Sequence, residues 1–552
     1  MKKFFKYSIS IAAAALCLYS CDDVVNIPAT DRLTQDAIWS GSEAVLDQYV
    51  IGLYGAVREK STIKMLDSQF TDCLTDLMKD GDWIASRRYN RKNYNFEPFT
   101  SDDASILGNW GDSYIRIRRF NEFLRDVNKY GEKYSDDFLK PRIAEVRFMR
   151  AMQYFYLIRI YGGVVLRDKY VGPEENDKAR MSEADSWQWV IDEIKTVIPD
   201  LPVEWTADNY TRLTRIAAYG FLSRVALYAE QWDECVDAAT QCETLGASLA
   251  STYAEVFSDK YSKENLMIVD FAPTGLNHNA DQIFRPAGDN ATHGNKGFGS
   301  PIVPTAEFAD AFEMTDGTAF SWTAYKANPA AWDNDPFSKR DPRFYTTIIY
   351  NNQDWESRKI EAYEGGDDGI QLFKKEGFRT ATCTGYYYRK FITENDNSWD
   401  TAGSNHFDIM LRFGEVVLNK AEALAHQSGK LSDAVKELNR LRNRAGMPDA
   451  SAADFDSFMK VLEHERIVEL GGENFRFWDL RRWKLGVVRL NNKSFHGVWI
   501  KQDATAPGGF TYDECDIDDG SKHVFMERYY CFALPQAEIN ANGAINENNP
   551  GW

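Results

Sequence analysis

The apolar positions along this 552-residue chain predict a mostly helical protein. Residues 143–161 are apolar almost all the way round, as in a buried helix, and Gly162-Gly163 ends the segment. Residues 412–427 place apolar side chains at the i, i+4, i+8 and i+11 spacing of one helix face. Gly429 then makes a turn, and residues 432–444 carry a facing apolar stripe. These segments therefore predict two packed helices.

A second pair of helices is predicted for residues 215–246, with a break between its two arms. Helix, short turn, helix is the organisation of tetratricopeptide repeats. Residues 270–410 and 486–530 differ, because Gly, Asn, Asp, Pro and aromatic residues cluster there without a long helical period. We therefore expect a helical scaffold with long irregular loop and short-strand insertions, and we expect binding to occur in the insertions.

The first residues have the pattern of a lipoprotein signal peptide. Three lysines precede an apolar run of ten residues from Ile9 to Leu18, which is too short to span a bilayer. The run ends in Leu18-Tyr19-Ser20-Cys21, which resembles a bacterial lipobox although Tyr19 is larger than usual. We expect residues 1–20 to be removed and Cys21 to be acylated, which would anchor the chain in a membrane. A plain signal peptide that is cleaved elsewhere is the alternative.

The overall charge limits the classes of partner. The net charge of −19 repels phosphate backbones, so nucleic acid is not an expected partner. It also argues weakly against an anionic glycan, unless a local basic patch exists. The eight cysteines form no CxxC pair, so the sequence predicts neither a zinc ribbon nor a thioredoxin-like motif, and free thiols are expected.

Catalytic motifs are not apparent. The run Glu465–Trp483 is rich in both carboxylates and arginines, but we interpret it as a helix that locks its neighbours through ion pairs and Arg stacking. His464-Glu465 lacks the second histidine of a zinc protease, and residues 513–520 do not match an EF-hand. We therefore predict no catalytic residues and no cofactor, and only a structural calcium ion of another kind stays open.

Aromatic residues in irregular segments are the candidate ligand contacts. A sugar has an apolar C–H face and directional hydroxyls, so its site needs a flat ring beside hydrogen-bonding side chains. Two stretches, 81–96 and 320–335, supply this mixture. The loop near 278–294, with His278, Asn279 and His293, ranks third. The candidate residues of the first two stretches are Trp83, Arg87, Arg88, Tyr89, Trp322, Tyr325 and Trp332.

Several ordered stretches resemble the SusD family of glycan-binding lipoproteins, also called the RagB/SusD family. They are residues 145–166 (EVRFMRAMQYFYLIRIYGGVVL), 301–317 (PIVPTAEFADAFEMTDG), 339–343 (KRDPR), Gly385-Tyr386 with Lys390-Phe391, 412–424 (RFGEVVLNKAEAL), 465–483 (ERIVELGGENFRFWDLRRW), and the end from Leu534-Pro535 to Gly551-Trp552. The resemblance runs from Cys21 to Trp552.

The resemblance implies a scaffold of about four tetratricopeptide helix pairs, with an N-terminal region at 21–270 and a C-terminal region at 271–552. It also implies a surface-exposed lipoprotein of the outer membrane that binds an oligosaccharide or polysaccharide without catalysis. The implied partner is a SusC-like TonB-dependent transporter, which this protein would cover as a lid. Two alternatives stay open: a helical-barrel glycoside hydrolase, and a repeat scaffold that binds only protein.

Overall fold

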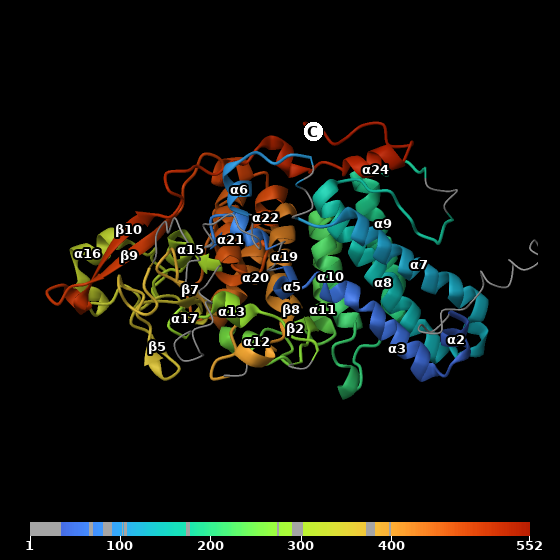
Figure 1. The fold of residues 1–552 in the computed structure, drawn as a ribbon, viewed down its shortest axis with the longest axis horizontal. Coiled ribbons are helices and arrows are strands. Elements are labelled where there is room, and N and C mark those ends of the chain that lie inside the picture. The colour runs from blue at the N-terminus through green and yellow to red at the C-terminus, as the bar shows by residue number, and fades with distance from the viewer. Residues whose placement is uncertain are drawn as a thin grey trace, which may run out of the picture.

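The computed structural model describes residues 35–65, 70–80, 91–101, 103, 107–172, 177–272, 275–289, 302–370, 381–396 and 399–552. Over these ranges the chain forms an elongated body, with long helices at one end and short strands and loops at the other (Figure 1). Within the same ranges, no helix combines the length and the apolar composition that a membrane crossing needs.

The long helices form the scaffold. They are α3 (Glu43–Leu53), α7 (Trp110–Tyr130), α8 (Asp136–Tyr161), α9 (Glu183–Val197), α10 (Arg215–Tyr228), α11 (Trp232–Thr244), α19 (Phe413–His426), α20 (Leu431–Arg444) and α21 (Phe455–Leu470). The shorter helices are α2 (Gln35–Ser40), α4 (Gly55–Arg58), α5 (Thr62–Met65), α6 (Arg91–Phe96), α12 (Tyr253–Ser258), α13 (Ala280–Phe284), α15 (Ala306–Ala311), α16 (Trp322–Ala327), α17 (Pro342–Thr347), α18 (Trp399–Ala402), α22 (Arg476–Arg482), α23 (Gly486–Arg489) and α24 (Gln536–Ala541).

The strands are short and pair two by two. The antiparallel pairs are β1 (Met78–Asp80) with β3 (Ile302–Pro304), β2 (Asn265–Val269) with β8 (Asp408–Arg412), β4 (Ile348–Ile349) with β7 (Tyr387–Tyr388), β5 (Asp354–Trp355) with β6 (Arg358–Lys359), and β9 (His496–Gln502) with β10 (Phe510–Asp516). Most lie in the two segments in which the sequence predicted short strands and loops.

Local sequence explains where the helices begin and end. Ser135 caps α8 by accepting a hydrogen bond from the backbone N–H of Phe138, and Thr214 caps α10 in the same way. Helix α8 ends at Gly162, whose φ of 69° lies in the region that glycine adopts without strain. Gly429, with a φ of 77°, makes the turn between α19 and α20. The four helices predicted from hydrophobic spacing at these places are confirmed.

Consecutive helices pack side by side as in tetratricopeptide repeats. Helix α7 packs on α8, α8 on α9, α10 on α11, and α19 on α20. Helix α11 also packs on α19, which joins the N-terminal and C-terminal helices into one scaffold. One hydrophobic core runs through this scaffold, and a second core fills the loop-rich end around Phe308, Phe344 and Tyr388. The mostly helical, repeat-like fold is therefore confirmed.

The run Glu465–Trp483 is not one continuous helix. Helix α21 ends at Leu470, the chain turns at Gly471-Gly472, and α22 begins at Arg476. Gly472 has a φ of 78°, and an added Cβ there would lie 2.3 Å from the hydroxyl of Tyr388. The pair of glycines is therefore required by close packing, and the single helix expected from the sequence is corrected to two.

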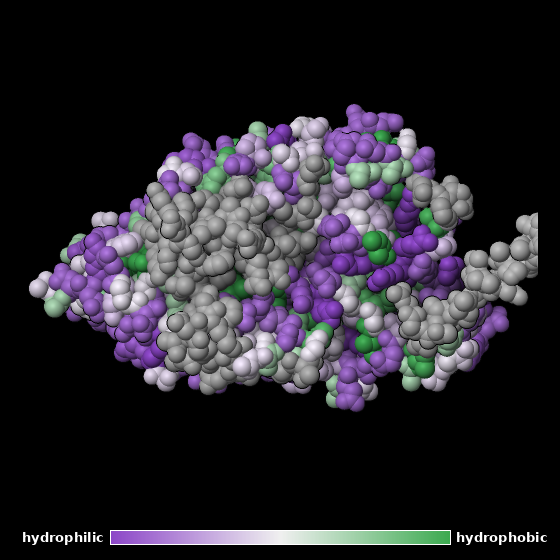
Figure 2. Space-filling view, in the orientation of Figure 1, coloured by the Kyte–Doolittle hydropathy of each residue, from purple (hydrophilic) through white to green (hydrophobic). Residues whose placement is uncertain are grey.

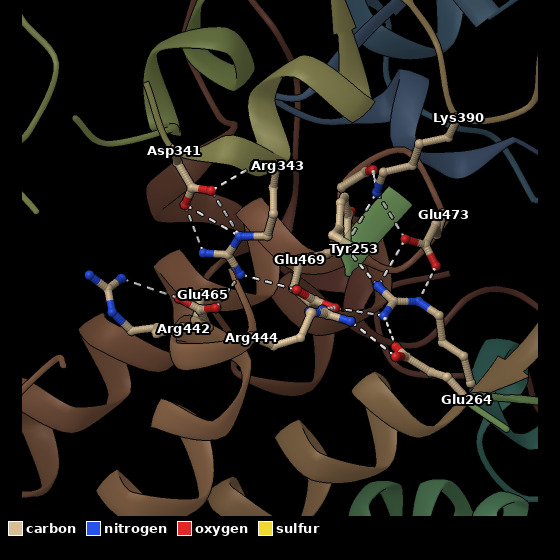
Figure 3. Close-up of polar contacts among 12 residues, drawn as sticks. Tyr253, Glu264, Asp341, Arg343, Lys390, Arg442, Arg444, Glu465, Glu469 and Glu473 are labelled. Carbon is tan, nitrogen blue, oxygen red and sulfur yellow. Dashed lines mark hydrogen bonds and ion pairs between the residues drawn. The ribbon is translucent and has the colours of Figure 1, made fainter. Parts of the chain in front are cut away.

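The same run carries a buried ionic network between the scaffold and the loop-rich end (Figure 3). Glu469 accepts hydrogen bonds from Arg412 at 2.7 Å, Arg444 at 2.5 Å and Arg343 at 3.0 Å. Glu465 pairs with Arg343 and lies 3.4 Å from Arg442. These side chains are almost wholly buried. The expectation that this run locks neighbouring segments through ion pairs is confirmed.

The network has two further members. Glu473 accepts hydrogen bonds from Lys390 at 2.9 Å and from Arg412 at 2.8 Å. Glu264, from the loop before β2, accepts one from Arg412 at 3.0 Å. Residues from β8, α20, α21 and the segments around α17 and β7 are therefore held at one point, which fixes the loop-rich end on the helices.

Candidate functional site

Three of the predicted aromatic residues gather at the outer end of the loop-rich region. Trp322 and Tyr325 lie on α16, and Trp332 ends the short 3-10 helix Pro329–Trp332 that follows. Helix α16 lies beside the β9–β10 hairpin at the tip of the molecule (Figure 1). The structure therefore brings these residues together on two adjacent helical turns.

Local sequence accounts for this compact double turn. Ser321 caps α16 by accepting a hydrogen bond from the backbone N–H of Ala324. Pro329 starts the next turn at the position where its missing N–H is tolerated. Asp333 and Asn334 then adopt left-handed conformations, with φ of 57° and 60°, which their short polar side chains allow. Trp322 and Trp332 both pack against Phe320 and Tyr325.

The indole of Trp322 is half-buried and held in a fixed orientation. Its ring stacks on Tyr512 of β10, with centroids 5.5 Å apart and planes 29° apart. Its Nε1 donates a hydrogen bond to Oδ2 of Asp310 at 3.1 Å. Sequence reasoning missed Tyr512 and Asp310, because neither lies in the segment that contains Trp322. Only the pairing of distant segments shows that they support this ring.

Tyr325 does not offer a ring face to a ligand. It is only 4% exposed, and its hydroxyl donates to the backbone oxygen of Asn334 at 3.2 Å. Its ring contacts Trp332 at 5.8 Å and Trp322 at 6.2 Å between centroids. The expected contact between Tyr325 and a ligand is therefore corrected, because the ring is used to pack the two tryptophans.

Polar side chains surround the two half-buried indoles. Asn328 and Asp333 are exposed on the turns that follow α16. Lys326 pairs with Asp513 of β10 at 3.1 Å, and Lys339 pairs with Asp333 at 3.1 Å. In Figure 2 this tip is mostly hydrophilic. Flat rings beside an amide, carboxylates and ammonium groups are the combination that suits a saccharide.

Asp310 gives this site a titratable group. Burial raises the pKa of the Asp310 carboxyl to about 7, and Arg340 acts in the opposite direction. The Oδ1 atom is buried without a hydrogen-bond partner among the described residues. A folded-state pKa above the usual value of 3.8 means that this carboxyl contributes stability at low pH and that the contribution is lost as pH rises towards 7.

We therefore expect the Trp322 environment to titrate near pH 7. Ionisation of Asp310 changes the charge on the acceptor of the indole Nε1–H, so the NMR resonance of that proton should shift with a midpoint near pH 7. The resonance is identified by its loss in Trp322→Phe. Asp310→Asn should abolish the transition, and an unchanged transition in this variant would assign it to another group.

Other candidates fall outside the described residues or in the interior. Trp83, Arg87, Arg88, Tyr89, Cys21 and His293 lie outside the described residues, so their roles stay predictions. His278 is 8% exposed, its Nδ1 accepts a hydrogen bond from the N–H of Ala280, and burial lowers its pKa to about 4. The suggestion that His278 contacts a ligand is corrected, because its ring is committed to the surrounding backbone.

The remaining sequence candidates are held by ordinary internal contacts. Asp516 accepts hydrogen bonds from the backbone N–H groups of Asp518 and Gly520 at 2.8 Å and 2.6 Å. Asp518 pairs with Lys79 and lies 3.3 Å from His523. The question of a structural calcium ion in this turn stays open, as it does from the sequence. Six cysteines in the described part of the chain are free thiols, and four of them are buried.

Comparison with known proteins agrees with this architecture. Residues 263–552 match the model of the SusD family, and residues 30–227 match a family described as starch-binding and associating with the outer membrane. A SusD-like protein of Bacteroides ovatus is 23% identical, with 98% of this chain and 94% of the relative covered.

Solved structures show the same fold. A SusD-like protein of Bacteroides fragilis has a TM-score of 0.79 at 25% identity, over 95% of this chain and all (100%) of that protein. A SusD-like carbohydrate-binding protein of the same species has a TM-score of 0.74 at 24% identity, over 92% of this chain and 100% of that protein. The SusD family model covers more than half of this chain, so the chain belongs to the SusD family.

Proposed function

We propose that this protein is a surface-exposed, lipid-anchored protein that binds a glycan at the outer membrane and delivers it to a TonB-dependent transporter. The observation that carries the proposal is the pair of half-buried indoles, Trp322 and Trp332, at the exposed tip beside Asn328 and Asp333. Such a surface stacks on the apolar face of a sugar ring and accepts hydrogen bonds from its hydroxyls. The structural relative named as carbohydrate-binding supports the same ligand class.

We propose binding without catalysis. The carboxylates that first suggested acid–base chemistry, Glu465 and Glu469, are buried and bound to arginines. Carboxylates in glycosidases must reach the scissile bond from an open cleft. We also propose a SusC-like TonB-dependent transporter as the partner. Membership of the SusD family supports this partner, because the family resemblance implies that the protein covers the transporter as a lid.

The ligand class is tested by isothermal titration calorimetry of the folded protein against a panel of plant, algal and microbial polysaccharides and their oligosaccharides. We expect binding to at least one glycan without release of reducing sugar. Silence across the whole panel, with a cooperative unfolding transition confirming the fold, would contradict the proposal. Sugar release that one carboxylate substitution abolishes would favour a hydrolase.

The anchor is tested at Cys21, which follows the lipobox-like residues Leu18-Tyr19-Ser20. We expect Cys21→Ala to abolish incorporation of radiolabelled palmitate and to release the protein from the outer-membrane fraction, because several acyl chains on one residue provide the membrane affinity. Cys17→Ala is the matched control and should retain both. Continued labelling of Cys21→Ala would place the acylation elsewhere.

A further inference from the structure

A pocket is lined by residues of α7. In Figure 1 this helix lies at the end of the molecule opposite α16, the helix that carries Trp322. The pocket has a volume of about 270 Å³ and is formed by α7 and the segment after α8 that contains residues 167–171. Ile115, which is 54% exposed, and Tyr114 contribute apolar surface to it. A volume of this size accommodates one sugar unit and its substituent better than a long chain segment.

The lining of this pocket is basic, although the whole chain has a net charge of −19. Arg118, Arg167 and Lys169 all line it, and none of the described residues that line it is acidic. Figure 2 shows strongly hydrophilic residues gathered over α7 on this face. Clustered cations in an acidic protein produce a local positive potential that attracts an anion.

Nearby contacts hold Arg118 in position without using all of its donors. Its Nε donates to Glu122 at 3.1 Å, and its Nη2 donates to the hydroxyl of Tyr170 at 3.0 Å. The guanidinium of Arg125 packs on the ring of Tyr170, 4.4 Å from its centroid, and Arg125 also pairs with Asp126 at 2.7 Å. A guanidinium carries five N–H groups, so Arg118 retains donors for an oxyanion.

The second wall is equally ordered. Asn121 donates to the backbone oxygens of Arg167 at 2.8 Å and of Lys169 at 3.1 Å, which ties the segment to α7. Tyr114 donates to the backbone oxygen of Val165 at 2.7 Å. The ammonium group of Lys169 is exposed. Among the described residues, none accepts a hydrogen bond from it or forms an ion pair with it. The segment therefore holds Arg167 and Lys169 on a fixed backbone. On α7, Glu122 is the carboxylate that contacts Arg118.

We propose that this pocket binds an acidic sugar unit through its carboxylate or sulfate group, with Arg118 and Lys169 as the principal contacts. The apolar edge of Ile115 and Tyr114 would contact the sugar ring. The inference rests on the proposed function for the saccharide part of the ligand, whereas the requirement for an anion comes from the pocket itself. It gives the protein a second contact site that selects charged glycans, independent of Trp322 and Trp332.

The test is calorimetric titration of the full mature chain with three matched oligosaccharide series: uronic acid-containing, sulfated, and neutral. We expect at least one acidic series to bind, and Arg118→Gln with Lys169→Gln to weaken that binding about tenfold. The double variant should leave the binding of any neutral ligand unaffected. In the wild type, about 0.5 M NaCl should weaken the binding of acidic ligands, because exposed charges are strongly screened at this salt concentration. Lys140→Gln, an exposed lysine of α8 paired with Asp136 at 2.9 Å, is the control.

The outcomes separate the two proposals. Acidic binding that is insensitive to the double variant, or no binding of either acidic series by folded protein, would overturn the acidic-sugar site. Binding of neutral glycans that Trp322→Ala removes would leave the proposed function intact in that case. Equal weakening of acidic and neutral ligands by the double variant would also overturn the site, because it would show a general structural effect. Binding to vesicles of anionic lipid in preference to both acidic series, lost in the double variant, would assign the pocket to a membrane headgroup instead.

Discussion

Replacing Glu469 by Gln is expected to lower the free energy of unfolding by about 3–5 kcal/mol, the usual cost of leaving buried charges without their partner. Glu469 is fully buried and binds Arg343, Arg412 and Arg444 (Figure 3). Gln keeps the size of the side chain but removes the negative charge, so these guanidinium groups lose their shared counter-ion. The network joins the loop-rich end to the helices, and the variant should therefore weaken that junction.

Urea denaturation followed by circular dichroism measures the effect. Asp433→Asn is the control, since Asp433 forms an exposed pair with Lys430 at 3.0 Å and such pairs contribute about 0–1 kcal/mol. If Glu469→Gln were as stable as Asp433→Asn, the buried network would not be a main determinant of stability.

The pH dependence of stability gives an independent readout. Burial acts to raise the pKa of Glu469, but the charges of Arg444, Arg412 and Arg343 outweigh it and hold the pKa well below the usual 4.5. The stability from this group is therefore present above pH 4.5 and is lost as pH falls through the lower folded-state pKa. Wild type should lose more stability than Glu469→Gln between neutral pH and the acid range. Parallel curves would contradict this assignment.

Removing both half-buried indoles, Trp322→Ala with Trp332→Ala, is expected to reduce affinity for the cognate glycan by at least about tenfold, or about 1.4 kcal/mol. Stacking of a sugar on a ring depends on the area and orientation of that ring, and both indoles are oriented by packing on Tyr325. Each single variant should have a smaller effect. Affinity is measured by calorimetry with the glycan that the panel identifies.

Trp189→Ala is the control for this experiment. Trp189 is also half-buried, but it lies on α9 and packs on Tyr154, with centroids 5.0 Å apart. It should lower stability without changing glycan affinity. Unchanged affinity in the Trp322/Trp332 double variant, with the fold intact, would move the glycan site away from this tip.

The sequence was sufficient for five of the scaffold helices, α8, α10, α11, α19 and α20. The spacing of Phe413, Val417, Ala421 and Leu424, and the glycine that follows at 429, depends only on neighbouring residues. Helix periodicity is a local property, so α8, α10, α11, α19 and α20 could be predicted without knowing what they contact. The ordered motifs carried the family resemblance, and the predicted segment around Trp322 was found because loop composition is also local.

Tertiary structure decided the features that depend on contacts between distant segments. The sequence could not show that Tyr325 is buried while Trp322 is half-exposed, because both are aromatic and lie on the same short helix. Nor could it show that Asp310 and Tyr512 support Trp322, or that Glu264, Arg343 and Glu469 meet in one network. Burial and charge pairing are set by which segments pack together, and residues far apart in the chain acquire those partners only when it folds.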